Sequence, residues 1–222
     1  DNSVANMGTL SLTTWYHLAA TFIFSGTGTL QAIKNGVVQA TTTGIVSDID
    51  NPGLNLYVGS DDGANYFNGR IDELRISSVK RSIEWLAAET SNGNAPATFY
   101  TAGAEEAEVN AERDAEITGG AGTWYNGSWA YRVKITVASS KVDASLTDYP
   151  VYVSLTDLPA DFHTNVKTDG GDIRVTTDDG VTEIPRDLVF YDNAGDVGEL
   201  HFKGDVSATV DTDFYIYYGN AA

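Results

Sequence analysis

Residues 129–137 read WAYRVKITV, and this stretch decides the fold class of the chain. Its apolar and aromatic side chains alternate with polar ones, so that one face would carry Trp129, Tyr131, Val133 and Ile135. A period of two is the pattern of a strand with one buried face and one solvated face. The stretch therefore predicts a strand of an antiparallel sheet.

Similar short segments follow it at regular intervals. The predicted strands lie at 151–155, 172–176, 188–191, 199–203 and 214–218. Asp179-Gly180 is a turn signal between two of them, and Pro150 and Pro185 stand where a strand tolerates a missing N–H. About seven short strands separated by turns predict an antiparallel β-sandwich over residues 129–222.

The first half of the chain is also rich in strand signals. Asn35-Gly36 is the strongest hairpin signal, because a type I′ turn needs a positive φ at both central positions. Ser82 is a candidate N-cap for one short helix that stops at Asn92-Gly93. The predicted strands lie at 15–22, 30–34, 37–42, 54–58 and 67–77.

The composition excludes several functions. The 222 residues include 13 Lys and Arg against 31 Asp and Glu, which gives a net charge of −18. Such a surface repels nucleic acid and anionic membranes. No stretch approaches the roughly 20 apolar residues of a membrane-spanning helix, so direct membrane insertion is not expected. The absence of Cys excludes disulfides and thiolate chemistry.

The charge is concentrated where the two halves meet. Residues 105–118 read EEAEVNAERDAEIT, and a Gly-rich tract follows them. Polar, charged and Gly-rich segments of this kind are typical of exposed connectors. We therefore predict a first module at 1–104, a linker at 105–128 and a second module at 129–222.

The first module resembles the C-terminal half of a laminin-G-like, concanavalin A-type jelly roll over about residues 8–104. The resemblance is carried by TWYHLAATF, by LQAIKNGVV and by the stretch GRIDELRI at 69–76, with Arg81-Ser82 and Trp85 after it. It implies an incomplete sandwich, since a jelly roll uses about eight strands in two sheets. An incomplete sandwich would expose apolar faces and edges unless another polypeptide completes it.

The second module resembles domain-of-unknown-function family 2341 over about residues 129–220. The resemblance is carried by WAYRVKITV, by DYPVYVSLTDLPADFHTNVKTDGGDIRVTTDDGVTEIPRDLVFYD and by TDFYIYYGNAA. It implies that the module occurs beside laminin-G-like domains in bacterial and archaeal surface proteins. No activity is established for the family. The expected location is therefore extracellular or on the prokaryotic cell surface.

Calcium is the one cofactor that the acidic loops suggest. Calcium takes six to eight oxygen ligands, and jelly rolls of the resembled kind often hold it near their strand loops. The candidate ligands are Asp61, Asp62, Asn65 and Asp72. A second group is formed by Asp169, Asp172, Asp178 and Asp179. Ordinary turn chemistry, which also favours Asp, is the competing interpretation for both groups.

Exposed aromatic side chains would stack on sugar rings. Tyr57, Tyr66 and Phe67 surround the Asp61 loop and are the candidate carbohydrate-binding residues, with core packing as the alternative. For Trp124-Tyr125, beside the linker, sugar stacking and packing are again the two alternatives. Asn126-Gly127-Ser128 is a glycosylation sequon and is equally a plain turn.

Nothing in the chain predicts an enzyme. His17 and His201 lie inside strands without a nucleophile elbow beside them, which disfavours a hydrolase triad. Asp72 and Glu73 would point to opposite faces of a strand, which excludes them as a glycosidase pair.

The sequence thus predicts an all-β chain of two antiparallel sandwich modules, the first an incomplete jelly roll with one short helix. The leading functional hypothesis is a non-catalytic structural or adhesive module of a microbial surface protein or filament, assembled by strand complementation. Its partners would be other copies of the chain or the missing half of the jelly roll. The alternative is a calcium-dependent, lectin-like module whose partners are glycans.

Overall fold

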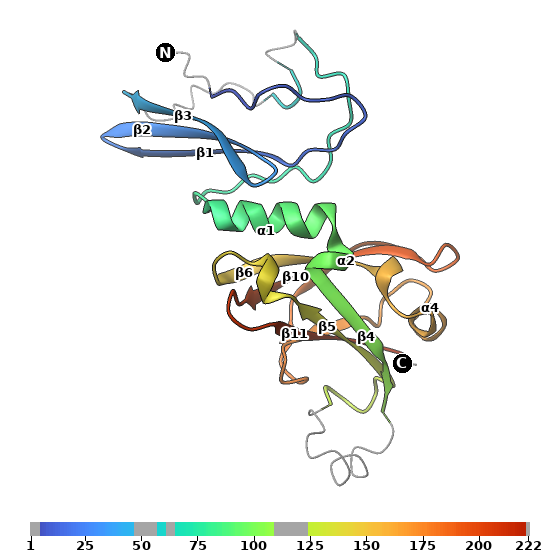
Figure 1. Cartoon of the computed structure of the whole chain (residues 1–222). Helices are drawn as coiled ribbons and strands as arrows, with labels where there is room; N and C mark the ends of the chain where they lie inside the picture. The colour runs from blue at the N-terminus through green and yellow to red at the C-terminus, as the bar shows by residue number, and fades with distance from the viewer. Residues whose placement is uncertain (1–4, 47–56, 61–64, 109–123, 221–222) are drawn as a thin grey trace. The chain divides into compact units, whose positions relative to one another are not determined.

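The computed structural model describes residues 5–46, 57–60, 65–108 and 124–220, and its chain forms two compact units. The first unit spans Asp1–Ile83 and the second spans Glu84–Ala222 (Figure 1). All three sheets are antiparallel. The predicted all-β class is therefore confirmed.

The first unit contains a three-stranded sheet in the order β1-β2-β3, formed by β1 (Leu18–Ser25), β2 (Thr27–Lys34) and β3 (Val37–Ile45). The turn between β2 and β3 has φ angles of 50° at Asn35 and 75° at Gly36. Two consecutive positive φ values are what a type I′ hairpin requires, so the predicted turn is confirmed.

The expected strand at 67–77 is wrong among the described residues. Residues 65–80 form no regular strand, and every one of them is exposed. Glu73 has a φ of 52°, which breaks the alternation of faces that a strand needs. Of the predicted strand at 54–58, residues 54–56 lie outside the described residues, and Tyr57 and Val58 are irregular.

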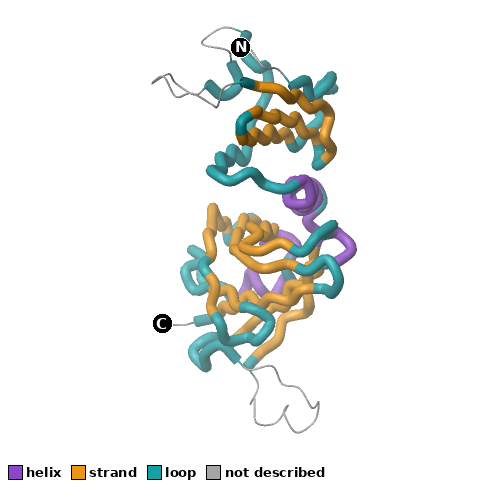
Figure 2. The backbone as a smooth tube through the Cα atoms, turned by 90° about the vertical axis from the view of Figure 1, so that its left-hand side faces the viewer, coloured by secondary structure: helices purple, strands orange, loops and turns teal. Residues whose placement is uncertain are grey.

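The second unit is a sandwich of a five-stranded and a three-stranded sheet, with the orders β4-β5-β11-β7-β8 and β6-β10-β9. Figure 2 shows its strands in orange, with α1 seen end-on in purple beside them. The strands are β4 (Tyr100–Ala107), β5 (Tyr131–Val137), β6 (Leu146–Ser154), β7 (Arg174–Thr176), β8 (Glu183–Ile184), β9 (Arg186–Asp192), β10 (Val197–Val206) and β11 (Thr212–Tyr218). The helices are α1 (Ile83–Asn94), α2 (Pro96–Phe99) and α4 (Ala160–Asn165).

The core of the second unit follows the predicted alternation. The inward positions of the strands are fully buried, while their neighbours in sequence are partly exposed or hydrogen-bonded on the outer face. The buried set includes Val133, Ile135, Val151, Val153, Leu200, Phe202, Phe214 and Ile216. The helix α4 was not predicted; its Phe162 is fully buried and packs edge-on against Tyr218 at 4.7 Å.

The division between the units differs from the predicted boundary after residue 104. Strand β4 pairs along β5, from Tyr100 opposite Val137 to Ala107 opposite Tyr131. Residues 105–107, predicted as linker, are therefore part of the five-stranded sheet. The helix α1 also belongs to the second unit, because the Trp85 ring meets the Tyr149 ring edge-on at 5.4 Å.

Two buried side chains close the outer edge of β6. The Asn92 amide donates to the Tyr152 carbonyl at 2.9 Å and accepts from the Tyr152 N–H at 2.8 Å. The Tyr100 hydroxyl accepts from the Ser154 N–H at 3.0 Å and donates to the Asp157 carboxylate at 3.1 Å. An open strand edge invites pairing with other chains, and here side chains of α1 and β4 fill it.

Two buried tyrosines predict a loss of stability at high pH. Burial raises the pKa of Tyr100, and Asp157 adds to the rise; burial and Glu105 raise that of Tyr218. A raised pKa stabilises the fold below about pH 10, the unfolded value, and this stability is lost as the pH rises further. We expect the free energy of unfolding to fall above pH 10 by up to about 1.4 kcal/mol per pH unit for each tyrosine.

This pH dependence is measured by urea unfolding between pH 8 and 11. The double variant Tyr100→Phe with Tyr218→Phe should be less stable at pH 8 but should lose less stability with rising pH. Tyr66→Phe, at an exposed position, is the control. An unchanged slope in the double variant would contradict the assignment.

No helix in the described part of the chain is both long enough and apolar enough to cross a membrane.

Candidate functional site

The predicted calcium loop is described only in part. Asp61 and Asp62 lie outside the described residues. Asn65 is exposed with a left-handed φ of 48°, a conformation that asparagine adopts readily in turns. Asp72 is also exposed, and its carboxylate accepts the Glu73 N–H at 3.0 Å. The calcium hypothesis for these four residues stays a prediction.

In the second acidic group, backbone donors occupy the carboxylates of Asp172 and Asp179. Asp172 is buried and accepts the N–H groups of Gly219 at 2.7 Å, Asn220 at 3.1 Å and Lys167 at 3.1 Å. Asp179 accepts the N–H groups of Val181 and Thr182, and these bonds together with the Thr182 hydroxyl lower its pKa. The Asp179 bonds lie within one turn and are the turn chemistry that competed with calcium. The Asp172 bonds are long-range, and they tie the end of β11 to the loop before β7.

The three candidate sugar-stacking residues are exposed. The exposed fractions are 44% for Tyr57, 74% for Tyr66 and 50% for Phe67. The Phe67 N–H donates to the Gly59 carbonyl at 2.7 Å, which brings the segment after Tyr57 next to Phe67. Tyr66 directly precedes Phe67, so the three aromatic residues lie on two neighbouring segments of the first unit.

Asn126 forms a plain turn. Its side-chain oxygen accepts the Ser128 N–H at 2.9 Å, and its carbonyl accepts the Trp129 N–H at 3.0 Å. The glycosylation of Asn126 stays a prediction.

Trp124 and Tyr125 pack on the outer face of the five-stranded sheet. The indole of Trp124 donates to the Trp129 carbonyl at 2.7 Å, and the Tyr125 ring meets the Trp129 ring at 5.1 Å. The buried guanidinium of Arg132 lies 4.7 Å from the Trp124 ring and 4.2 Å from that of Tyr215. Packing, the alternative to sugar binding for this pair, accounts for these contacts.

Sequence reasoning missed Arg132. Its Nε lies 2.7 Å from the Glu106 carboxylate, and it also donates to the Tyr217 hydroxyl at 2.9 Å. The available signal was an Arg on the polar face of a strand, opposite a strand whose polar face carries tyrosines.

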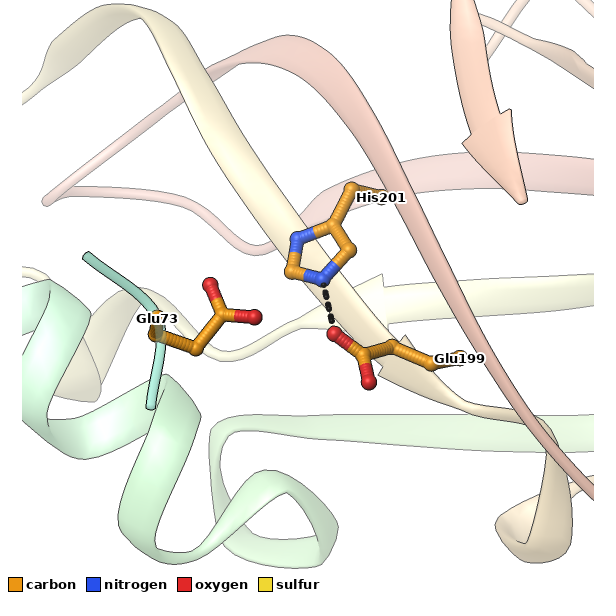
Figure 3. A group of neighbouring side chains, drawn as sticks. All are labelled: Glu73, Glu199 and His201. Atoms are coloured by element: carbon orange, nitrogen blue, oxygen red, sulfur yellow. Dashed lines mark hydrogen bonds and ion pairs between the residues drawn. The ribbon is translucent and has the colours of Figure 1, made fainter. Parts of the chain in front are cut away.

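His201 lies inside a strand as predicted, whereas His17 lies just before β1 and not inside it. Figure 3 shows His201 and Glu199, both on β10, with His201 Nε2 2.8 Å from the Glu199 carboxylate. The His201 ring stacks on Tyr152 at 5.2 Å. Glu73, also labelled there, belongs to the first unit and pairs with Arg75 at 2.7 Å. The N–H of His17 donates to the Asn35 side chain at 3.0 Å.

One family model matches the sequence of the first unit. Residues 1–87 match the laminin-G-like model of the concanavalin A-like lectin/glucanases superfamily. The resemblance of the first half to this fold is thereby supported, and the resemblance of the second half to family 2341 stays a prediction. No curated protein and no solved structure matches the chain. Laminin-G-like domains are commonly extracellular, with which the fold is compatible.

Proposed function

We propose that the chain is a non-catalytic structural or adhesive module of a microbial extracellular protein, and that its first unit assembles by strand complementation. The observation that carries the proposal is the exposed apolar segment at 65–80. The laminin-G-like match of residues 1–87 is compatible with an adhesive or a lectin-like module.

Five apolar side chains of this segment are at least half exposed. The exposed fractions of Ile71, Leu74 and Ile76 are 52%, 61% and 75%. Phe67 and Val79 are the other two. Burial of one such side chain stabilises a protein by about 1.5–3 kcal/mol, so a partner that covers several of them gains substantially.

The segment also has the composition of a strand, although it lies in no sheet of the described residues. A strand from another polypeptide would supply the ladder hydrogen bonds and the apolar cover together. That polypeptide is a second copy of the chain or a further part of the laminin-G-like fold. If each copy completes the next, the contact is head-to-tail, and a head-to-tail contact that does not close gives a filament.

The proposal is tested by the mass of the chain in solution. Light scattering should give a mass above the 23.8 kDa of one chain, and Leu74→Lys with Ile76→Lys should reduce the mass to that of one chain. Ser77→Lys with Ser78→Lys is the matched control, because it adds the same charge to exposed polar positions nearby. A monomeric parent chain would contradict assembly between copies.

A calcium-dependent lectin is the second candidate. The exposed Tyr57, Tyr66 and Phe67 favour it, because aromatic faces stack on sugars, and the matched superfamily is described by its lectins and glucanases. Glycan-array binding that a chelator abolishes, and that Tyr66→Ala weakens, would support the lectin. If the glycan array gave no signal and light scattering gave a mass above that of one chain, the lectin would be contradicted and the structural role supported.

A further inference from the structure

Two arginines of the second unit converge on one backbone oxygen. The Ile173 carbonyl accepts from Arg174 at 2.7 Å and from the Nε of Arg186 at 2.5 Å. Arg174 lies on β7 and Arg186 begins β9, and the antiparallel pairing of β7 with β8 brings the two arginines close together. Because both bonds end on the same oxygen, the two positive charges are held close to each other.

The positive charge of this pair is only partly neutralised. Arg174 Nε lies 3.4 Å from the Glu183 carboxylate. Arg186 forms no ion pair among the described residues. Burial lowers the pKa of Arg186 and the charge of Arg174 lowers it further, while the carboxylates of Glu183, Asp172 and Asp187 partly oppose the shift. Like charges that a fold holds side by side favour an anion that binds between them.

Both arginines line an open hollow of about 550 Å³. It is lined by Gly171, Arg174, Glu183, Ile184, Pro185 and Arg186. The hollow is open to solvent, so a ligand in it would be held by one side and would stay partly exposed. Arg174 and Arg186 make one part of the lining cationic, Ile184 and Pro185 make another part apolar, and Glu183 adds one carboxylate.

We propose that this hollow binds the carboxylate of an acidic sugar, such as a uronic acid, and this site is independent of the first unit. A guanidinium offers paired donors that match the two oxygens of a carboxylate. The ring of the sugar would lie against Ile184 and Pro185.

Glu183 selects among the anions. Its carboxylate is held by the Tyr125 hydroxyl at 2.5 Å as well as by Arg174, and it remains on the lining of the hollow. A carboxylate accepts hydrogen bonds from sugar hydroxyls but repels a compact dianion such as phosphate or sulfate. The net charge of −18 also disfavours a long polyanion, so the suited ligand carries one charge and several hydroxyls.

The probe is galacturonic acid, with galactose and inorganic sulfate as comparisons. We expect galacturonic acid to shift the Nε–Hε resonances of Arg174 and Arg186 in the NMR spectrum of the full chain, with saturation in the millimolar range. Galactose should cause no saturable shift, and sulfate should bind at least tenfold more weakly. High salt should weaken the binding of galacturonic acid, because charge drives it.

Arg186→Gln should weaken the binding of galacturonic acid at least tenfold. Lys203→Gln, which removes one exposed positive charge from β10, is the matched control and should leave binding unchanged. Arg186→Lys keeps the charge without the Nε bond to Ile173. Its affinity for galacturonic acid should lie between those of the parent chain and of Arg186→Gln, which covers the case in which the Gln variant folds poorly. No shift with galacturonic acid, equal shifts with galactose, or equal affinity for sulfate would each overturn the proposal.

Discussion

A chain that begins at Glu84 is expected to fold cooperatively, whereas a chain that begins at Trp129 is expected to be largely unfolded. The shorter chain lacks β4, so it exposes the edge of β5, and it lacks Phe99 and Tyr100, which are almost completely buried. It also lacks Trp85, whose ring packs on Tyr149. Each such side chain contributes about 1.5–3 kcal/mol, and a domain has only about 5–15 kcal/mol in total.

Urea unfolding followed by circular dichroism measures this difference. The chain from Glu84 should show one transition with a steep slope, and the chain from Trp129 should bind an apolar dye without a cooperative transition. A third chain that begins at Pro96 separates the contribution of β4 from that of α1, and its stability should lie between the two. Equal stability of the chains from Glu84 and Trp129 would show that β4 and α1 are dispensable.

Asn92→Ala is expected to destabilise the second unit strongly for a substitution that removes no large apolar side chain. The side chain is 2% exposed, and its loss leaves the N–H and the carbonyl of Tyr152 without their hydrogen bonds to Asn92. Leaving two part-buried backbone groups unsatisfied costs about 2–4 kcal/mol. The free energy of unfolding should fall by that amount.

Asn94→Ala is the matched control for this substitution. Asn94 ends the same helix and is exposed, so its replacement removes no buried group. We expect a change within about 0.5 kcal/mol, as is usual for surface positions. Ala has a higher helix propensity than Asn, so an equal loss of stability in both variants would contradict the assignment of the effect to the edge of β6.

The sandwich of the second unit was predictable because its strands alternate clearly. Val133 and Ile135, like Val151 and Val153, are fully buried as their period of two indicates. The strand β4 was missed because its sequence, YTAGAEEA, is small, polar and acidic, and such residues are typical of a linker. These residues form a strand only because they pair with β5, which lies further along the chain. The local composition carries no signal of such long-range pairing.

The candidate sites were less predictable than the fold. The sequence left calcium and turn chemistry open for the acidic residues, because it does not say whether a carboxylate such as that of Asp172 faces a cation or three backbone N–H groups. The pair of Arg174 and Arg186 had no sequence signal. Their convergence depends on where the Ile173 carbonyl points, which is a property of the folded loop.

The edge of β6 has a consequence for how such modules are inherited and recombined. The family match runs to residue 87 and so takes in the first turn of α1, while Asn92, further along the same helix, is hydrogen-bonded to β6 of the second unit. The unit that sequence comparison recognises and the unit that folds therefore overlap within one helix. A genetic exchange at the recognised family border would cut α1 and give each recipient part of a helix. An exchange before Glu84 would transfer an intact sandwich together with the helix that closes its edge.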